Sequence, residues 1–167
     1  TSCTVKGIMC MESDKSYGSF ESNNLPYKET QGIKPTNVYE VSKACSGLIT
    51  NAYSNNYDMP VFTVRAANLY GPGDMNISRL IPGTILRILG DKSPILYSGG
   101  ADYIREFLHV EDAVIGMVGL MEQIDKSRSN IFNIGSSSIH TISDVMNIVL
   151  KSMNKEIEVQ IIEKDPL

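Results

Sequence analysis

Apolar residues along the chain form two kinds of pattern: short β-branched runs, and stretches in which they recur every three or four residues. Residues 60–65 are a β-branched run typical of a buried strand, and residues 6–11 and 131–135 are similar apolar runs. Residues 41–53 carry apolar side chains at helical spacing, and residues 80–89 repeat that pattern. Strands that alternate with helices form parallel or mixed sheets, so the pattern predicts an α/β fold.

Beyond Gly90 the predicted elements become shorter, which indicates a small α+β lobe. Asp112 is a candidate N-cap for one of its helices, because a carboxylate accepts hydrogen bonds from the free amides of a first turn. Earlier in the chain, residues 12–37 are polar and turn-rich, which is typical of a functional or disordered loop. The remaining predicted elements are strands at residues 95–97, 106–110 and 156–162, a helix ending near residue 123 and a helix at residues 143–153.

Composition excludes several classes of function. The 167 residues suit one domain, and a net charge of −4 leaves no basic surface for nucleic acid. The most apolar window, residues 113–121, is far shorter than the roughly 20 residues that cross a bilayer, so we expect no membrane partner. Neither histidine has a partner pattern for a metal ion. The absence of an apolar leader favours the cytoplasm, as do three cysteines without metal-ligand spacing: Cys3, Cys10 and Cys45.

Tyr39 and Lys43 stand four residues apart, so they share one face of the first predicted helix. A Lys ammonium beside a phenol favours the phenolate, which can act as a general base toward a substrate hydroxyl. The face continues with residues small enough for a ligand to approach, namely Ser46, Gly47 and Thr50. Taken alone, the pair is also compatible with an ordinary solvated helix face.

Residues 13–18, Ser-Asp-Lys-Ser-Tyr-Gly, directly follow the first predicted strand. Ligands of open α/β sheets bind beyond the carboxyl ends of the strands, so polar residues here are candidates for chemistry. An ordinary Asp-containing turn explains the same spacing equally well.

Arg65 and Asn68 belong to a second strand end, and they are candidates to contact an anionic or polyhydroxylated ligand. The alternative for Arg65 is a structural ion pair. Arg79 and Arg105 also lie near predicted strand ends or turns, and the guanidinium fork suits a diphosphate.

Together these segments resemble the extended short-chain dehydrogenase/reductase family, specifically its nucleotide-sugar epimerases and dehydratases. Five motifs occur in the family's order over almost the whole chain. They are the strand-end motif at residues 13–18, Tyr-x-x-x-Lys at Tyr39 and Lys43, Arg-x-x-Asn-x-Tyr-Gly-Pro-Gly at residues 65–73, Arg-Asp-Phe-x-x-Val-x-Asp at residues 105–112 with Glu106 in place of Asp, and Phe-Asn-x-Gly at residues 132–135.

Within that family, Asp14 followed by Lys15 looks most like the CDP-glucose 4,6-dehydratases, whereas the epimerases usually carry Ser or Ala in place of Asp14. The resemblance implies that Tyr39, held as a phenolate by Lys43, takes the proton of the sugar 4-hydroxyl while NAD accepts hydride. Both residues would also contact NAD. Asp14 would protonate the leaving 6-hydroxyl, Lys15 would be the carbon-5 base and Ser13 would bind the sugar. The implied substrate-binding residues are Tyr17, Asn68, Arg79 and Arg105.

The family's glycine-rich NAD turn is not found among the 13 glycines. We therefore expect residues 1–75 to be the C-terminal part of a Rossmann-like parallel sheet that carries the catalytic Tyr and Lys. Residues 76–167 would form an interleaved nucleotide-sugar-binding α+β lobe. The main NAD-binding half would lie upstream, and the family's closing segment beyond residue 167. The alternatives are an epimerase of the same family and a non-catalytic nucleotide-sugar-binding remnant. The resemblance favours a homodimer for the complete enzyme.

Overall fold

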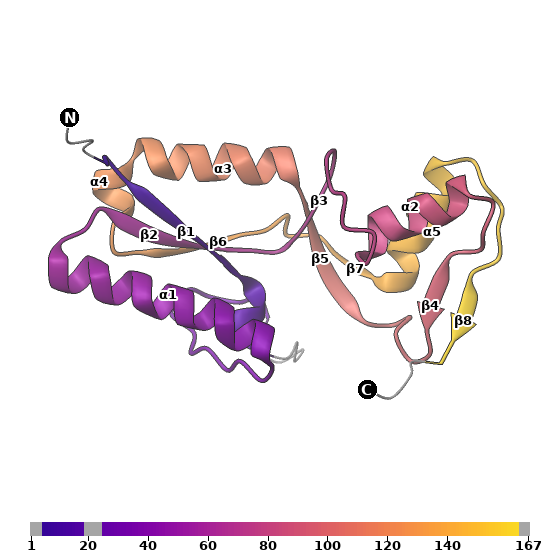
Figure 1. Cartoon of the computed structure of the whole chain (residues 1–167), viewed down its shortest axis with the longest axis horizontal. Coiled ribbons are helices and arrows are strands. Elements are labelled where there is room, and N and C mark those ends of the chain that lie inside the picture. The colour runs from indigo at the N-terminus through magenta and orange to yellow at the C-terminus, as the bar shows by residue number, and fades with distance from the viewer. Residues whose placement is uncertain (1–4, 19–24, 164–167) are drawn as a thin grey trace. The chain divides into compact units, whose positions relative to one another are not determined.

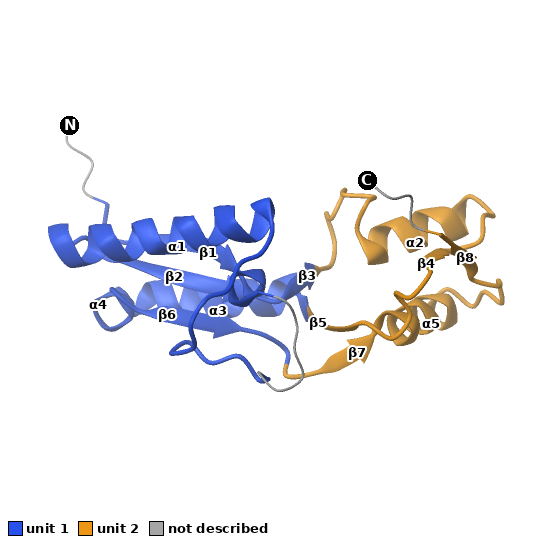
Figure 2. Cartoon of the chain, turned by 90° about the horizontal axis from the view of Figure 1, so that it is seen from below, with its two compact units in different colours: residues 1–69, 108–136 blue, residues 70–107, 137–167 orange. Residues whose placement is uncertain are grey.

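A computed structural model describes residues 5–18 and 25–163. The chain divides into two compact units, drawn in different colours in Figure 2. Unit 1 comprises residues 1–69 and 108–136, and unit 2 comprises residues 70–107 and 137–167. This division follows only from how the residues pack. The functional division into a catalytic part at residues 1–75 and a sugar-binding part at residues 76–167 stays a prediction.

Unit 1 contains a parallel sheet in the strand order β1-β2-β6, as Figure 1 shows. The strands are β1 (Ile8–Ser13), β2 (Val61–Ala66) and β6 (Ile131–Ile134). All six residues of β2 are buried, because the strand is central and covered on both faces. The β-branched run therefore forms the buried strand that the sequence predicts.

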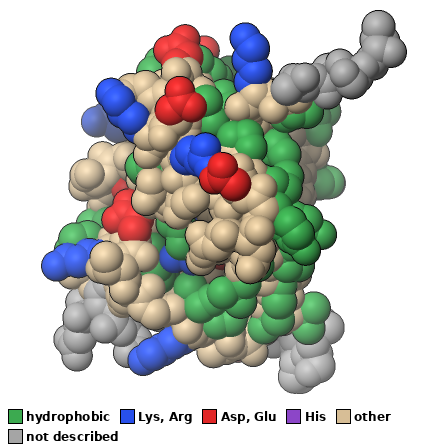
Figure 3. All heavy atoms as spheres, turned by 90° about the vertical axis from the view of Figure 1, so that its left-hand side faces the viewer, with side chains coloured by type: hydrophobic (Ala, Val, Ile, Leu, Met, Phe, Trp, Pro, Cys, Tyr) green, Lys and Arg blue, Asp and Glu red, His purple; other side chains and the backbone are tan. Residues whose placement is uncertain are grey.

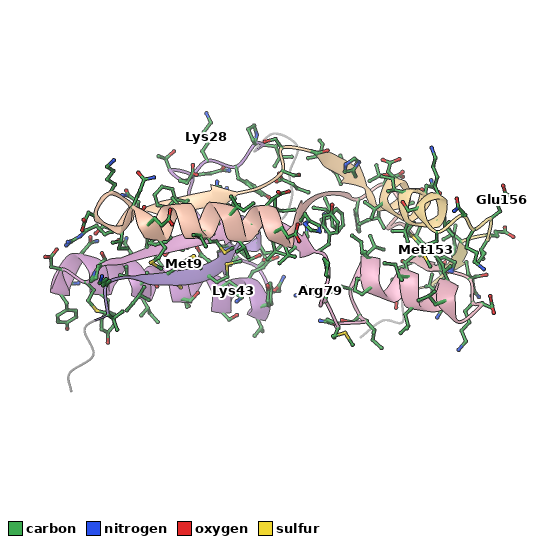
Figure 4. All side chains as sticks on the ribbon, turned by 90° about the horizontal axis from the view of Figure 1, so that it is seen from above. Met9, Lys28, Lys43, Arg79, Met153 and Glu156 are labelled. Atoms are coloured by element: carbon green, nitrogen blue, oxygen red, sulfur yellow. The ribbon has the colours of Figure 1, made fainter. Side chains whose placement is uncertain are left out.

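Helices cover both faces of this sheet (Figures 1 and 4). The long helix α1 (Val38–Tyr57) packs on β1 and β2, and α3 (Val110–Glu122) covers the opposite face. A short helix, α4 (Ile124–Ser127), follows α3 and contacts β2. The buried cluster under α3 consists of Ala67, Leu108 and Ala113, with Leu69, Met117 and Ile134 packed against it.

Unit 2 is built from short elements. It differs in extent from the lobe predicted beyond Gly90, because it begins at Tyr70 and residues 108–136 belong to unit 1. Two helices, α2 (Leu80–Leu89) and α5 (Ile142–Ser152), pack against each other. One strand pair, β4 (Ile95–Tyr97) with β8 (Gln160–Ile162), is parallel. The pair β5 (Ile104–His109) with β7 (Ile139–Thr141) is antiparallel, and β3 (Asn68–Tyr70) lies on the other side of β5 in the same sheet. The first two residues of β3 and the last two of β5 belong to unit 1. The mixed α/β architecture is thus the predicted one.

The predicted cap at Asp112 is wrong. Helix α3 begins at Val110, and His109 is its N-cap, with its ring nitrogen Nδ1 accepting a hydrogen bond from the Glu111 amide. Asp112 lies inside the first turn, where a carboxylate still interacts favourably with the helix dipole.

The predicted loop at residues 12–37 also needs correction at its start. Strand β1 runs on to Ser13, and a short 3-10 helix, η1 (Asp14–Tyr17), follows directly. The final strand is shorter than predicted, only three residues in β8. At Gly18, φ is +93°, and a Cβ there would lie 2.2 Å from the Lys34 carbonyl oxygen, so the turn after η1 requires glycine.

Candidate active site

Ser13, Asp14 and Lys15 form a contiguous polar cluster at the carboxyl end of β1. The Lys15 Nζ lies 2.8 Å from Asp14 Oδ2, and the Ser13 hydroxyl donates to Asp14 Oδ1 at 3.1 Å. Ser13 also caps η1 by accepting a hydrogen bond from the Lys15 amide at 3.3 Å. The Asp14 and Lys15 side chains remain 18% and 26% exposed, so a substrate can reach both groups.

Tyr39 and Lys43 lie on the same face of α1, as their spacing predicts. The Lys43 Nζ is 5.9 Å from the centroid of the Tyr39 ring, and Tyr39 is 55% exposed. Lys43 lies in the first half of α1 (Figure 4). Since α1 also packs against η1, the two candidate catalytic segments lie on elements in direct contact.

The start of α1 is held by two polar residues. Asn37 is the N-cap and accepts a hydrogen bond from the Glu40 amide at 3.0 Å. The Glu40 carboxylate accepts hydrogen bonds from the Thr36 amide and hydroxyl at 2.7 and 2.9 Å. The backbone hydrogen bond from Thr36 is the main reason that the pKa of Glu40 lies below its ordinary value, against the opposing effect of burial. These bonds define where α1 begins, and therefore where Tyr39 lies.

Arg65 takes the structural role that the sequence left open as its alternative. Its Nε donates to Glu12 Oε2 at 2.5 Å, and the two side chains are 5% and 0% exposed. Burial opposes the charge on Arg65, but its interactions with Glu12 and Tyr17 prevail and raise its pKa above the ordinary value. Arg65 and Glu12 therefore form a buried ion pair inside unit 1.

Glu12 is a site residue that sequence reasoning missed. Polar Glu12 next to Ser13 looks like the beginning of a loop, whereas it is the fifth residue of β1. The one available signal was the need of a buried arginine on a neighbouring strand for an acidic partner.

Tyr17 lies in the interior of unit 1. It is 4% exposed, its hydroxyl donates to Asn133 Oδ1 at 2.8 Å, and its ring stacks on that of Tyr27 at 4.6 Å. Asn133 also donates through its side-chain amide to the Tyr27 carbonyl oxygen at 3.1 Å. The substrate-binding role of Tyr17 stays a prediction, and the contacts of its side chain are internal.

The remaining predicted substrate-binding residues belong to other elements. Asn68 is the first residue of β3, at the end of the first stretch of unit 1. In unit 2, Arg79 is exposed and its Nη1 lies 3.3 Å from Asp74 Oδ2. Arg105 donates to the Ile104 carbonyl oxygen at 2.8 Å, and its guanidinium lies 5.6 Å from the Tyr103 ring centroid. Their role toward a diphosphate stays a prediction.

The space beside Gly47 is filled by the protein itself. Gly47 is buried, and a Cβ there would lie 2.8 to 2.9 Å from the carboxylate of Glu12. The interpretation of this small residue as room for a ligand is therefore wrong, because the Glu12 side chain occupies that room.

Large apolar side chains remain exposed on unit 1. They occur on both helices that cover the sheet, and Figure 3 shows hydrophobic side chains gathered along one edge of the face it draws. They include Val41, Leu48 and Tyr53 of α1 and Val114, Ile115 and Val118 of α3.

Three further properties bear on the expected partners. Within the described residues, none of the helices combines the length and hydrophobicity that a membrane crossing requires. Over residues 5–18 and 25–163, no three His, Cys, Asp or Glu side chains converge as metal ligands would. Cys10 and Cys45 are free thiols, and Cys3 lies outside the described residues.

Known proteins resemble this chain in sequence and in fold. The sequence model of the NAD dependent epimerase/dehydratase family matches residues 1–135. A trifunctional UDP-glucose 4,6-dehydratase, 3,5-epimerase and reductase of Arabidopsis thaliana is 27% identical over 97% of the chain. A dTDP-glucose 4,6-dehydratase of Mycolicibacterium smegmatis is 26% identical over 87% of it.

Solved structures match over nearly the same extent. A dTDP-glucose 4,6-dehydratase from Bacillus anthracis, in complex with NAD, covers 96% of the chain with a TM-score of 0.86 and 25% identity. A dTDP-glucose 4,6-dehydratase from Streptomyces venezuelae, also with NAD bound, covers 93% with a TM-score of 0.82 and 28% identity. These matches confirm the Rossmann-like α/β fold class.

The chain is shorter than each of these relatives. It spans 24% of the plant protein and 43% of the mycobacterial one. It spans 50% and 47% of the two solved chains.

Proposed function

The chain belongs to the NAD dependent epimerase/dehydratase family, and on that premise we propose that it is the catalytic and sugar-binding portion of a nucleotide-sugar 4,6-dehydratase acting on CDP-glucose. The reaction removes water from the hexose and yields a 4-keto-6-deoxy sugar. The observation that carries the proposal is the contact of Asp14 with Ser13 and Lys15 on η1, against the helix that holds Tyr39 and Lys43.

Tyr39 and Lys43 are the residues of this chain that would hold NAD and begin the reaction. An exposed phenol that shares a helix face with an ammonium, 5.9 Å from its ring, fits this role, because a bound ligand can reach the phenol. Bound there, NAD would supply an acceptor for the hydride of carbon 4 and the hydride that carbon 6 receives. The Tyr39 phenolate takes the proton of the 4-hydroxyl, which leaves a ketone at carbon 4.

Asp14 and Lys15 perform the elimination. The ketone makes the proton on carbon 5 acidic, Lys15 takes that proton, and Asp14 gives its own proton to the 6-hydroxyl, which leaves as water. Lys15 gives its proton back to carbon 5 when the hydride adds at carbon 6, and the proton that Tyr39 took replaces the one that Asp14 gave, so the net reaction releases one water. Lys15 Nζ and Asp14 Oδ2, 2.8 Å apart, thus act on the adjacent carbons 5 and 6.

The other predicted residues bind the substrate. Ser13 binds the sugar, and Asn68, Arg79 and Arg105 bind the nucleotide diphosphate, for which arginine forks are suited. Tyr17, the last residue of η1, fixes the end of that helix through its hydrogen bond to Asn133. The proposal includes a cytoplasmic location, expected from the free thiols, and a homodimer, expected from the resemblance.

The test uses the complete gene product that contains this sequence, incubated with NAD and with CDP-, dTDP- or UDP-glucose. Chromatography and mass spectrometry should detect loss of water and a 4-keto-6-deoxy product, formed fastest from CDP-glucose. Asp14→Asn should lower turnover by about 10²- to 10⁴-fold, the usual contribution of a general acid. Asp91→Asn is the control, because Asp91 is exposed and its φ of 52° is one that Asn tolerates.

Three other outcomes contradict the proposal in distinct ways. Unchanged turnover in Asp14→Asn contradicts the proposed dehydratase function. A product of altered stereochemistry without loss of water identifies an epimerase. Binding of CDP-glucose in calorimetry with no conversion identifies a non-catalytic binding protein.

A further inference from the structure

Three polar side chains cross the parallel sheet of unit 1 at one register position. Glu12 of β1 lies opposite Arg65 of β2, and Arg65 lies opposite Asn133 of β6. Residues at matching register share one face of a parallel sheet. The face is the one that α1 covers, because the Glu12 carboxylate lies against Gly47 of that helix. We call Glu12, Arg65 and Asn133 the polar row.

The polar row contacts both ends of the candidate catalytic segment. Glu12 immediately precedes Ser13 and binds the Arg65 guanidinium at 2.5 Å. Tyr17 ends η1, and its ring centroid lies 4.6 Å from the same guanidinium, while its hydroxyl donates to Asn133. Residues 13–16 therefore lie between two anchors that share one buried cation.

The polar row also determines how closely α1 approaches the sheet. Gly47 comes four residues after Lys43 on α1, and its missing side chain leaves the space that the Glu12 carboxylate fills. Glu12 Oε1 accepts no hydrogen bond from the described residues, so its position follows from the pairing of Oε2 and from the fit against Gly47. The Glu12 side chain thus connects its own strand, which ends in Ser13, to the helix that carries Tyr39.

Stability alone is a poor explanation for such a pair. Taking two charges out of water costs about as much as their attraction returns, and apolar side chains often stabilise the same site better. Charges in register across a sheet instead fix direction and distance, because the guanidinium fork accepts few arrangements of its partners.

We propose that Glu12, Arg65 and Gly47 position the two catalytic segments relative to each other, a role that rests on the dehydratase function proposed above. The Arg65 guanidinium holds Asp14 through its contacts with Glu12 and Tyr17. Glu12, packed against Gly47, holds the helix face of Tyr39 and Lys43. None of the three touches the reacting atoms.

The experiment compares two glycine variants of the complete gene product, Gly47→Ala and Gly119→Ala. Both glycines lie inside helices, so alanine has the same intrinsic effect on helix formation at each. At Gly119 a Cβ meets nothing within 4 Å among the described residues, whereas at Gly47 it meets the Glu12 carboxylate. Gly47→Ala should lower kcat for dehydration by about tenfold to a hundredfold, since small misplacements of reacting groups have such effects. Gly119→Ala should leave kcat unchanged.

Two readouts separate positioning from mere folding. The KM for the nucleotide sugar should stay within about twofold, because binding in the ground state is untouched. The pH profile of kcat should shift in Gly47→Ala, because it reports the acid and the base in the complex. A rescue variant adds Glu12→Asp, which withdraws the carboxylate by one methylene group. The double variant should recover much of the kcat that Gly47→Ala loses.

The outcomes separate the two proposals. A wild type that dehydrates no nucleotide sugar overturns the proposed function, and with it the reaction that the polar row would serve. An active wild type with an equally active Gly47→Ala overturns the positioning role alone. The positioning role is also overturned if the loss of kcat equals the loss of folded protein by near-ultraviolet circular dichroism, with an unmoved pH profile and no rescue.

Discussion

Residues 12–15, at the end of β1, take part in two ion pairs. The two pairs differ in the sequence separation of their partners and in their exposure to solvent. Glu12 and Arg65 come from separate strands, 53 residues apart, with side chains 0% and 5% exposed. Asp14 and Lys15 are neighbours in sequence, with side chains 18% and 26% exposed. The buried pair can hold geometry but cannot meet a substrate, whereas the partly exposed pair can exchange protons with one. In the proposed function, the buried pair therefore fixes the geometry and the neighbouring exposed pair carries out the chemistry.

The largest expected effect is on the buried pair. Arg65→Met leaves the Glu12 carboxylate buried without a partner, which should lower the free energy of unfolding by about 3–5 kcal/mol. Urea denaturation followed by circular dichroism measures it. The double variant Glu12→Met/Arg65→Met should lose less than Arg65→Met, because no orphan charge remains. A single-variant loss of under about 1 kcal/mol would mean that the two pairs are energetically alike.

The hydroxyl of Tyr17 should have a smaller effect. Tyr17→Phe removes the hydrogen bond to Asn133 and should lower the free energy of unfolding by about 1 kcal/mol. Tyr57→Phe is the matched control, because Tyr57 is 70% exposed, and it should leave the denaturation midpoint unchanged. Equal denaturation midpoints for the two variants would contradict a stabilising role of the hydrogen bond from Tyr17 to Asn133.

The exposed pair should respond in the opposite sense to the buried one. Lys15→Met should change the free energy of unfolding by only about 0–1 kcal/mol, because solvent screens the pair. Turnover of the complete gene product should nevertheless be lost, since Lys15 is the proposed carbon-5 base. A Lys15→Met variant that unfolds as readily as Arg65→Met would abolish the contrast between the two pairs.

The smallest effect concerns Glu40, a third carboxylate, at the start of α1. Its pKa lies below the ordinary value, chiefly because the Thr36 amide donates to it, so the charged form is stabilised in the folded state. That contribution is present above the ordinary glutamate value of about 4.3 and is lost as the pH falls through the folded-state pKa. Unfolding curves from pH 6 down to about pH 3 should therefore show a shallower acid decline for Glu40→Gln than for wild type. Parallel declines would contradict the assigned role of Thr36.

Local features could be predicted from the sequence with good accuracy. The β-branched run became β2, and the helical spacing at residues 80–89 became α2 at those residues. Tyr39 and Lys43 lie on one helix face because four residues span about one turn. In each case the deciding interactions join residues close in sequence, so the spacing alone contains the information.

The errors arose where a distant partner decides. Glu12 was assigned to a loop because a charged residue is rarely buried, yet Arg65 across the sheet makes its burial tolerable. Gly47 was interpreted as room for a ligand because its neighbour on β1 was unknown. Asp112 has the chemistry of an N-cap, but the path of β5 into α3 makes His109 the residue before the first turn.

The sequence by itself determined the α/β class, the order of the motifs and the pair Tyr39–Lys43 on one helix face, because each follows from propensity and short spacing. Only the tertiary structure decided that Arg65 pairs with Glu12 and that Tyr17 reaches Asn133, 116 residues away. The physical reason is the register of the parallel strands. A shift of one residue in β1, β2 or β6 would turn Glu12, Arg65 or Asn133 to the other face of the sheet. Strand patterns alone do not specify which residues of two distant strands lie opposite each other.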